Sequence, residues 1–159
     1  MREALRRLPV GRDQPVELRM LSAAVEDLAS QQTVPSLAAQ EAHSQWLQQV
    51  ESEDWRALAW SLAWLAPMAW PKTSTFLMPY LRTHASGVGR GLTRALLRRD
   101  FATAARLARW TALARQHGGE VGLDLTAVVR HLELCGGGGP VTTLHTAVAR
   151  HLVAPGEAS

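Results

Sequence analysis

The stretch from Leu92 to Gly119, LTRALLRRDFATAARLARWTALARQHGG, decides the fold because it reads as two consecutive helices. One side of the first helix carries leucines, at Leu92, Leu96 and Leu97, and the other side carries Arg90, Arg94 and Arg98. Asp100 stands where the second helix, over about residues 101–117, needs an N-cap, and two glycines follow that helix as is typical of a C-terminus. The stretch therefore predicts a helical protein.

The same signals recur along the rest of the chain. Apolar residues at helical spacing, bounded by caps, prolines and glycines, predict helices over about residues 14–31, 36–51 and 124–135. A further helix begins at Ser52 or Asp54 and ends before Pro67, and a last one runs from Thr142 or Thr143 to about residue 153. Prolines interrupt the apolar run between residues 68 and 82, which predicts a short or kinked helix there. Three glycines between His84 and Gly91 predict a flexible connector.

No segment alternates with the period of a strand, so the expected fold class is all-α. We expect a compact helical bundle of about six to seven helices in a single domain over residues 1–153, with a flexible tail over residues 154–159. A chain of 159 residues with 47% hydrophobic content is long enough to bury a core without disulfides or metal.

The expected compartment is the cytoplasm. Cys135 is the only cysteine and cannot form an intramolecular disulfide, and no leader-like segment opens the sequence. The longest apolar stretch, around residues 57–70, is interrupted by polar residues and proline, so we expect no membrane association.

Arginines are the strongest functional signal. Eight of them lie between Arg82 and Arg115, where Asp100 is the only acid, so this segment carries about +7 while the rest of the chain carries about −4. Guanidinium groups bind phosphates in bidentate fashion, which suits a nucleic-acid backbone. The candidate phosphate-binding residues are Arg90, Arg94, Arg98, Arg99, Arg106 and Arg109. A solvated helix face, or arginines that pair with acids of the fold or of a partner, would carry the same pattern.

Tryptophans supply a second signal, since five of the six fall between Trp46 and Trp70. At helical spacing tryptophans are more often core residues than stacking platforms. Trp60 and Trp64 flank the leucine stripe of their helix, so we expect these two to be exposed and to bind a protein partner.

Catalytic and metal sites are not expected. The six histidines form no pair at helical chelating spacing with a nearby carboxylate ligand, and no second cysteine accompanies them. The glycine-rich segments lack the preceding strand and the lysine of a phosphate-binding loop. The sequence thus predicts a protein that is not an enzyme and uses no cofactor.

Three segments of the carboxyl-terminal half resemble the CRISPR Cascade small-subunit (CasB-like) family. They are GLTRALLRRD at 91–100, LARWTAL at 107–113 and GLDLTAVVRHL at 122–132. The resemblance implies a small, basic, all-helical and non-catalytic subunit of a crRNA-guided antiviral complex. Such a subunit would contact the other subunits of that CRISPR effector complex and steady the backbone of crRNA or target DNA.

The competing hypothesis is a helical adaptor or scaffold that docks a partner through its tryptophan-rich region. Exposed Trp60 and Trp64 would make the isolated chain self-associate or need a co-expressed partner, whereas a nucleic-acid binder would purify with RNA and release it in salt.

Overall fold

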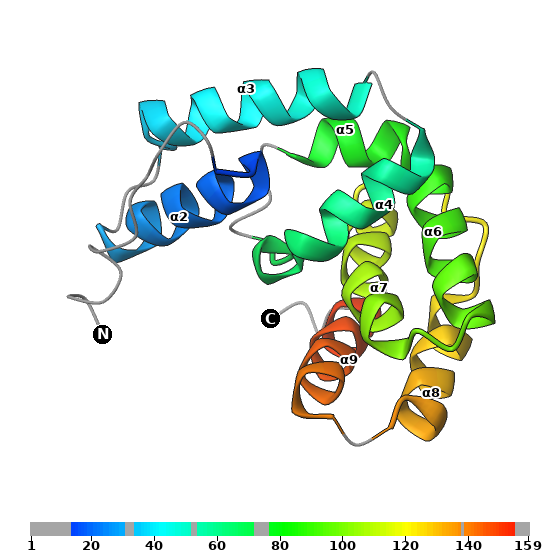
Figure 1. Ribbon diagram of the computed structural model, residues 1–159. Coiled ribbons are helices and arrows are strands. Elements are labelled where there is room, and N and C mark those ends of the chain that lie inside the picture. Colours follow the sequence, from blue (N-terminus) through cyan, green and yellow to red (C-terminus); the bar gives the residue numbers. More distant parts are fainter. Residues whose placement is uncertain (1–13, 31–33, 52–53, 72–76, 138, 155–159) are drawn as a thin grey trace. The chain divides into compact units, whose positions relative to one another are not determined.

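The computed structural model describes residues 14–30, 34–51, 54–71, 77–137 and 139–154 (Figure 1). Within these ranges every regular element is a helix, which confirms the predicted all-α class, and the eight α-helices are close to the expected six to seven. The chain divides into two compact units, Met1–Glu51 and Ser52–Ser159, and we describe each by itself. The single domain over residues 1–153 stays a prediction, and all but the first residue of the expected tail lies outside the described residues.

Unit 1 is a pair of packed helices, α2 (Val16–Ala29) and α3 (Leu37–Glu51). Ser36 caps α3, as its sequence position predicts, because its Oγ accepts the backbone N–H of Ala39 at 3.2 Å. The N–H of Ser36 itself donates to Oδ2 of Asp27 at 3.1 Å, which ties the start of α3 to α2. The buried apolar residues of the two helices are Val16, Met20, Ala23, Ala39, Ala42, Trp46 and Val50.

Unit 2 is organised around one central helix, α7 (Phe101–Gln116). The elements packed against it are α4 (Trp55–Trp64), η1 (Ala66–Met68), α5 (Met78–Thr83), α6 (Ala85–Leu97), α8 (Leu125–Cys135) and α9 (Pro140–Val153). Alanines at 104, 108 and 112 are buried and allow close approach of the surrounding helices. Trp110 is also fully buried, and its indole N–H donates to the carbonyl of Leu62 on α4. Because neighbouring elements enclose α7 on nearly all sides, more of its residues are buried than the apolar spacing in its sequence indicates.

The flexible connector predicted for His84–Gly91 is wrong, because α6 begins at Ala85 and runs through these glycines. Their role is close packing. A Cβ at Gly91 would overlap the Cβ of Ala59 on α4, and a Cβ at Gly89 would lie 2.5 Å from the carbonyl oxygen of Val121. The glycines therefore let α4 and the segment around Val121 approach the backbone of α6.

The corner between α6 and α7 closes as a Schellman motif. The N–H of Asp100 donates to the carbonyl of Ala95 at 2.9 Å, and the N–H of Arg99 donates to the carbonyl of Leu96 at 3.0 Å. Arg99 occupies the left-handed position, with φ of 57°, where glycine is the usual residue. Asp100 then caps α7 through the backbone N–H of Thr103, as predicted.

Within the described residues, the other expected helices begin and end within about one turn of the observed bounds. Met78–Thr83 is a short helix after Pro71, and α9 begins at Pro140, two residues before the predicted start, because proline is accepted in a first helical turn. Leu97 differs from its prediction: it ends α6 with its side chain 81% exposed, whereas Leu92 is buried. Along the part of the chain that the structure describes, no helix combines the length and the apolar character needed to cross a membrane.

Candidate nucleic-acid interface

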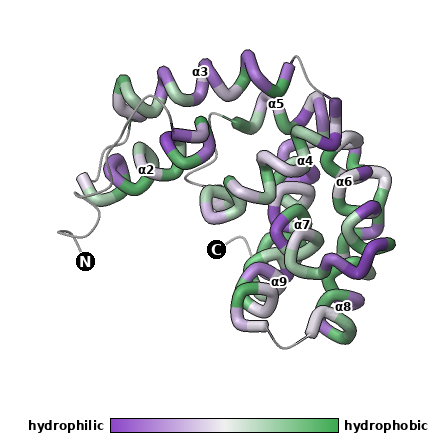
Figure 2. Tube along the Cα trace, in the orientation of Figure 1, coloured by the Kyte–Doolittle hydropathy of each residue, from purple (hydrophilic) through white to green (hydrophobic). Residues whose placement is uncertain are grey.

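Four of the six candidate arginines lie together on α6 and at its carboxyl-terminal end. Arg90 and Arg94 are one helical turn apart, Arg98 follows one turn later, and Arg99 occupies the corner. All four are exposed. We call these four residues the α6 arginine face. Figure 2 shows the hydrophilic residues that gather where α6 turns into α7.

Charge on the α6 arginine face is not neutralised by acids of the described chain. The ion pairs within the described ranges are Arg56 with Asp54 at 2.7 Å and Arg150 with Glu133 at 3.4 Å, and neither involves this face. Asp100 is the nearest acid in the sequence, and its Oδ1 accepts the N–H of Thr103 as the cap of α7. The face therefore presents a concentrated positive field to solvent.

Arg109 does not belong to this surface, and the expectation that it contacts phosphate is corrected here. Its side chain is buried between α7, η1 and α9. Nε and Nη2 donate to the carbonyl oxygen of Ala69 at 3.3 and 3.1 Å, and Nη1 donates to Nδ1 of His145 at 2.9 Å. All three nitrogens are thus used inside the fold, and burial lowers the pKa of Arg109 to about 10.

His145 is a neutral acceptor in this cluster. Arginine can only donate, so Nδ1 of His145 accepts and the imidazole proton sits on Nε2. Burial, followed by the charges of Arg109 and Arg106, lowers the pKa of His145 to about 4. Arg106 is half-buried, and because its charge acts on His145 of α9 we do not count it in the α6 arginine face.

An open groove of about 460 Å³ runs along the α6 arginine face. One wall is a single face of α6, and the other is the backbone turn at residues 121–123. The residues that line it are Ser86, Gly89, Arg90, Thr93, Arg94, Leu97, Val121, Gly122 and Leu123. The hydroxyl of Thr93 donates to the carbonyl of Gly89 at 3.0 Å, so this polar group is already satisfied. The groove thus combines an apolar surface with two guanidinium groups.

Trp60 and Trp64 lie on α4 and are exposed, as predicted, at 62% and 51% of their surface. Their rings meet edge to face with centroids 5.8 Å apart. Neither residue lines the groove beside α6. The structure therefore separates the two predicted sites onto two helices of unit 2.

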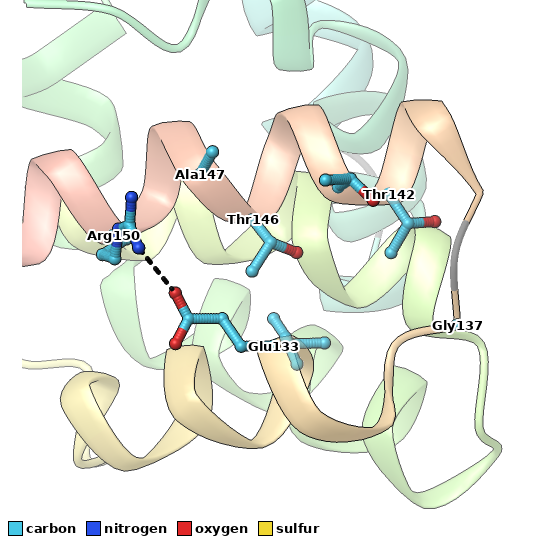
Figure 3. Close-up of a pocket in the computed structure, with 8 residues that line it drawn as sticks. Glu133, Gly137, Thr142, Thr146, Ala147 and Arg150 are labelled. Carbon is cyan, nitrogen blue, oxygen red and sulfur yellow. Dashed lines mark hydrogen bonds and ion pairs between the residues drawn. The ribbon is translucent and has the colours of Figure 1, made fainter.

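A smaller cleft of about 260 Å³ lies between α8 and α9 (Figure 3). Glu133 accepts a hydrogen bond from Nη1 of Arg150 across it, and the side chain of Thr146 points from α9 toward α8. The hydroxyl of Thr146 is buried without a hydrogen-bond partner in the described part of the chain. Because Glu133 offsets the charge of Arg150, this cleft offers no excess positive charge to a polyanion.

Sequence reasoning did not identify the groove or the Arg109–His145 cluster. The groove depends on Val121 and Leu123, which approach α6 from a turn that no local pattern places there. A signal for the cluster was present, since Arg109 stands in an otherwise apolar run between Leu107 and Leu113. An arginine enclosed by buried positions is a candidate for internal hydrogen bonding.

In comparisons with known proteins, no family model, no curated protein and no solved structure matches this chain.

Proposed function

We propose that the protein binds the phosphate backbone of nucleic acid through the α6 arginine face, as a non-catalytic small subunit of a crRNA-guided CRISPR effector complex. The observation that carries the proposal is the row of exposed arginines at Arg90, Arg94 and Arg98, extended by Arg99, which has no acidic partner in the described chain. The assignment to a CRISPR complex rests on the sequence resemblance of the carboxyl-terminal half.

Helical spacing supports a backbone-tracking role. Residues four apart on α6 are about 6 Å apart along the helix axis, which is comparable with the separation of neighbouring phosphates on a nucleic-acid strand. Arginine rather than lysine at these positions allows bidentate contacts to phosphate oxygens. Such contacts carry no base sequence information, so binding would be largely independent of sequence.

Ionic strength offers the direct test. Four phosphate contacts to a single strand predict a slope of about −3 in a plot of log affinity against log salt concentration. Fluorescence anisotropy of labelled single-stranded RNA and DNA with the full chain, from 25 to about 300 mM salt, measures this slope. Absence of binding at the lowest salt concentration would refute the proposal.

Exposed Trp60 and Trp64 favour a second candidate, a helical adaptor that docks a protein through α4. Two adjacent indoles on a surface helix are typical of interface anchors. Sedimentation velocity of the purified chain tests this candidate through self-association. A wild-type dimer that is lost in the double variant Trp60→Ser plus Trp64→Ser would support this candidate. A wild-type protein that stays monomeric at high concentration would show that these tryptophans do not mediate self-association.

A further inference from the structure

We infer that the groove beside α6 receives an unstacked nucleobase of the strand whose phosphates contact Arg90 and Arg94. This inference rests on the proposed function and names its substrate class, a single-stranded segment with at least one free base. Its basis is the shape and chemistry of the groove rather than the charge of the face alone.

Leu97 is the first observation. A leucine 81% exposed at the end of α6 stands within a row of arginines and lines the groove together with Arg94. Leu134, at the end of α8, is similarly exposed at 76% but lines no part of this groove. Proteins that bind the DNA minor groove insert apolar side chains, leucine among them, between stacked bases, and Leu97 can offer the same kind of apolar contact to a base.

The opposite wall is the second observation. Val121 is packed so closely against Gly89 that its carbonyl oxygen would lie 2.5 Å from an added Cβ. This contact fixes residues 121–123 beside α6 and forms a groove of about 460 Å³, within the range of sites that hold small organic ligands. Apolar surface on this wall comes mainly from Leu123, which is half-buried, because Val121 is only 7% exposed. The flat faces of a nucleobase are apolar, so a base fits this wall while its phosphate remains outside.

Charge placement is the third observation and favours a nucleotide over an acidic peptide. The two arginines of the groove, Arg90 and Arg94, flank its apolar surface and have no ion pair within the described residues. A nucleotide unit carries one anionic phosphate beside one flat apolar base, which matches that arrangement. A run of acidic side chains would fill the arginine sites but leave the apolar surface between them uncovered.

Arg99 supplies independent support for a functional corner. It holds the left-handed position of the Schellman motif, where glycine would be the more stable residue. Strained residues of this kind concentrate at binding sites. Arg99 does not line the groove itself, but it follows the lining residue Leu97 by two positions in the sequence.

Two oligomers with the same number of phosphates separate base capture from charge. One is a fluorescent oligothymidylate of twelve residues, and the other is the same backbone with abasic sites. The full-length protein should bind oligothymidylate about fivefold or more tightly at one salt concentration. Leu97→Ala should reduce that ratio toward one while leaving the salt slope unchanged, and Leu134→Ala should change neither quantity.

Equal affinity of the wild-type protein for the two oligomers would overturn the inference while leaving the proposed function standing, provided that both bind with the expected salt slope. An unchanged ratio in Leu97→Ala would overturn it as well. Polyglutamate of equal charge that competes as well as oligothymidylate would make the groove a site for acidic peptides. Failure of both oligomers to bind at low salt would refute the proposed function itself.

Discussion

Replacing Gly91 by alanine tests the close packing of α6 against α4. Glycine to alanine in a helix interior normally stabilises by about 1 kcal/mol, because alanine loses less backbone entropy on folding. At Gly91 the added methyl group would overlap the Cβ of Ala59, which belongs to a short side chain that cannot rotate away. The two helices must then move apart.

The expected magnitude follows from these two opposing effects. Carbon atoms in contact lie about 3.5–4.0 Å apart, so α4 and α6 must separate by about 1 Å or more. Overpacking of this kind costs about 1–3 kcal/mol, and the lost contacts across the interface add to that cost. After the gain of about 1 kcal/mol in helix propensity, Gly91→Ala should lower the free energy of unfolding by about 1–2 kcal/mol.

Gly87 provides a matched control one turn earlier on the same helix. A Cβ at Gly87 would lie 3.4 Å from the Cβ of Trp55, an ordinary contact distance. Gly87→Ala should therefore keep most of the propensity gain and raise the free energy of unfolding by about 0.5–1 kcal/mol. The two variants make the same chemical change and should shift stability in opposite directions.

Urea unfolding followed by circular dichroism at 222 nm gives the free energies. The melting temperature of Gly91→Ala should fall by about 3–8 °C, and that of Gly87→Ala should rise. A Gly91→Ala protein as stable as the wild type would contradict the close packing of α4 on α6. Equal shifts in both variants would contradict the assignment of the effect to Ala59.

Three further predictions concern the buried cluster, the corner and the exposed tryptophans. Because the pKa of His145 in the fold is lowered to about 4, the unfolded chain binds this proton before the folded chain does as pH falls. The free energy of unfolding should therefore be highest above about pH 6.5 and should drop by up to about 3 kcal/mol between pH 6.5 and 4. Urea titrations across that range check this, and His145→Gln should flatten the dependence; an unflattened profile would contradict the assignment. Arg99→Gly should raise the free energy of unfolding by about 1 kcal/mol while weakening oligonucleotide binding, and a less stable variant would contradict the left-handed corner. Trp60→Ser plus Trp64→Ser should change stability by less than about 0.5 kcal/mol for each residue in thermal melts, whereas loss of the folded baseline would contradict their exposure.

Local signals were sufficient for most helices. Asp54, Asp100 and Asp124 each accept backbone N–H groups at the start of a helix, and each is recognisable in the sequence as an acid before an apolar repeat. The first turns of α6 could not be predicted from the sequence. Glycine is needed at position 91 because Ala59, which is distant in the sequence, packs against it. A local reading assigns such glycines to a loop.

The candidate site, too, could be predicted from the sequence only in part. Arg90, Arg94 and Arg98 could be placed on one face because a single helix fixes their spacing. Arg109 could not, since its burial depends on η1 and α9, which enclose α7 from other parts of the chain. Spacing along one helix is therefore a guide to which residues share a face, and tertiary packing decides whether that face meets solvent.

Charge reversal on the α6 arginine face tests the central claim most directly. The double variant Arg94→Glu plus Arg98→Glu is compared, by anisotropy with labelled single-stranded RNA and DNA, with a control variant. The control, Arg82→Glu plus Arg130→Glu, makes the same change in net charge at exposed positions of α5 and α8, outside this face. Circular dichroism verifies that both proteins are folded. We predict that the first variant loses binding and the second weakens it only modestly; equal affinity of the two variants would contradict the claim that this face holds the strand.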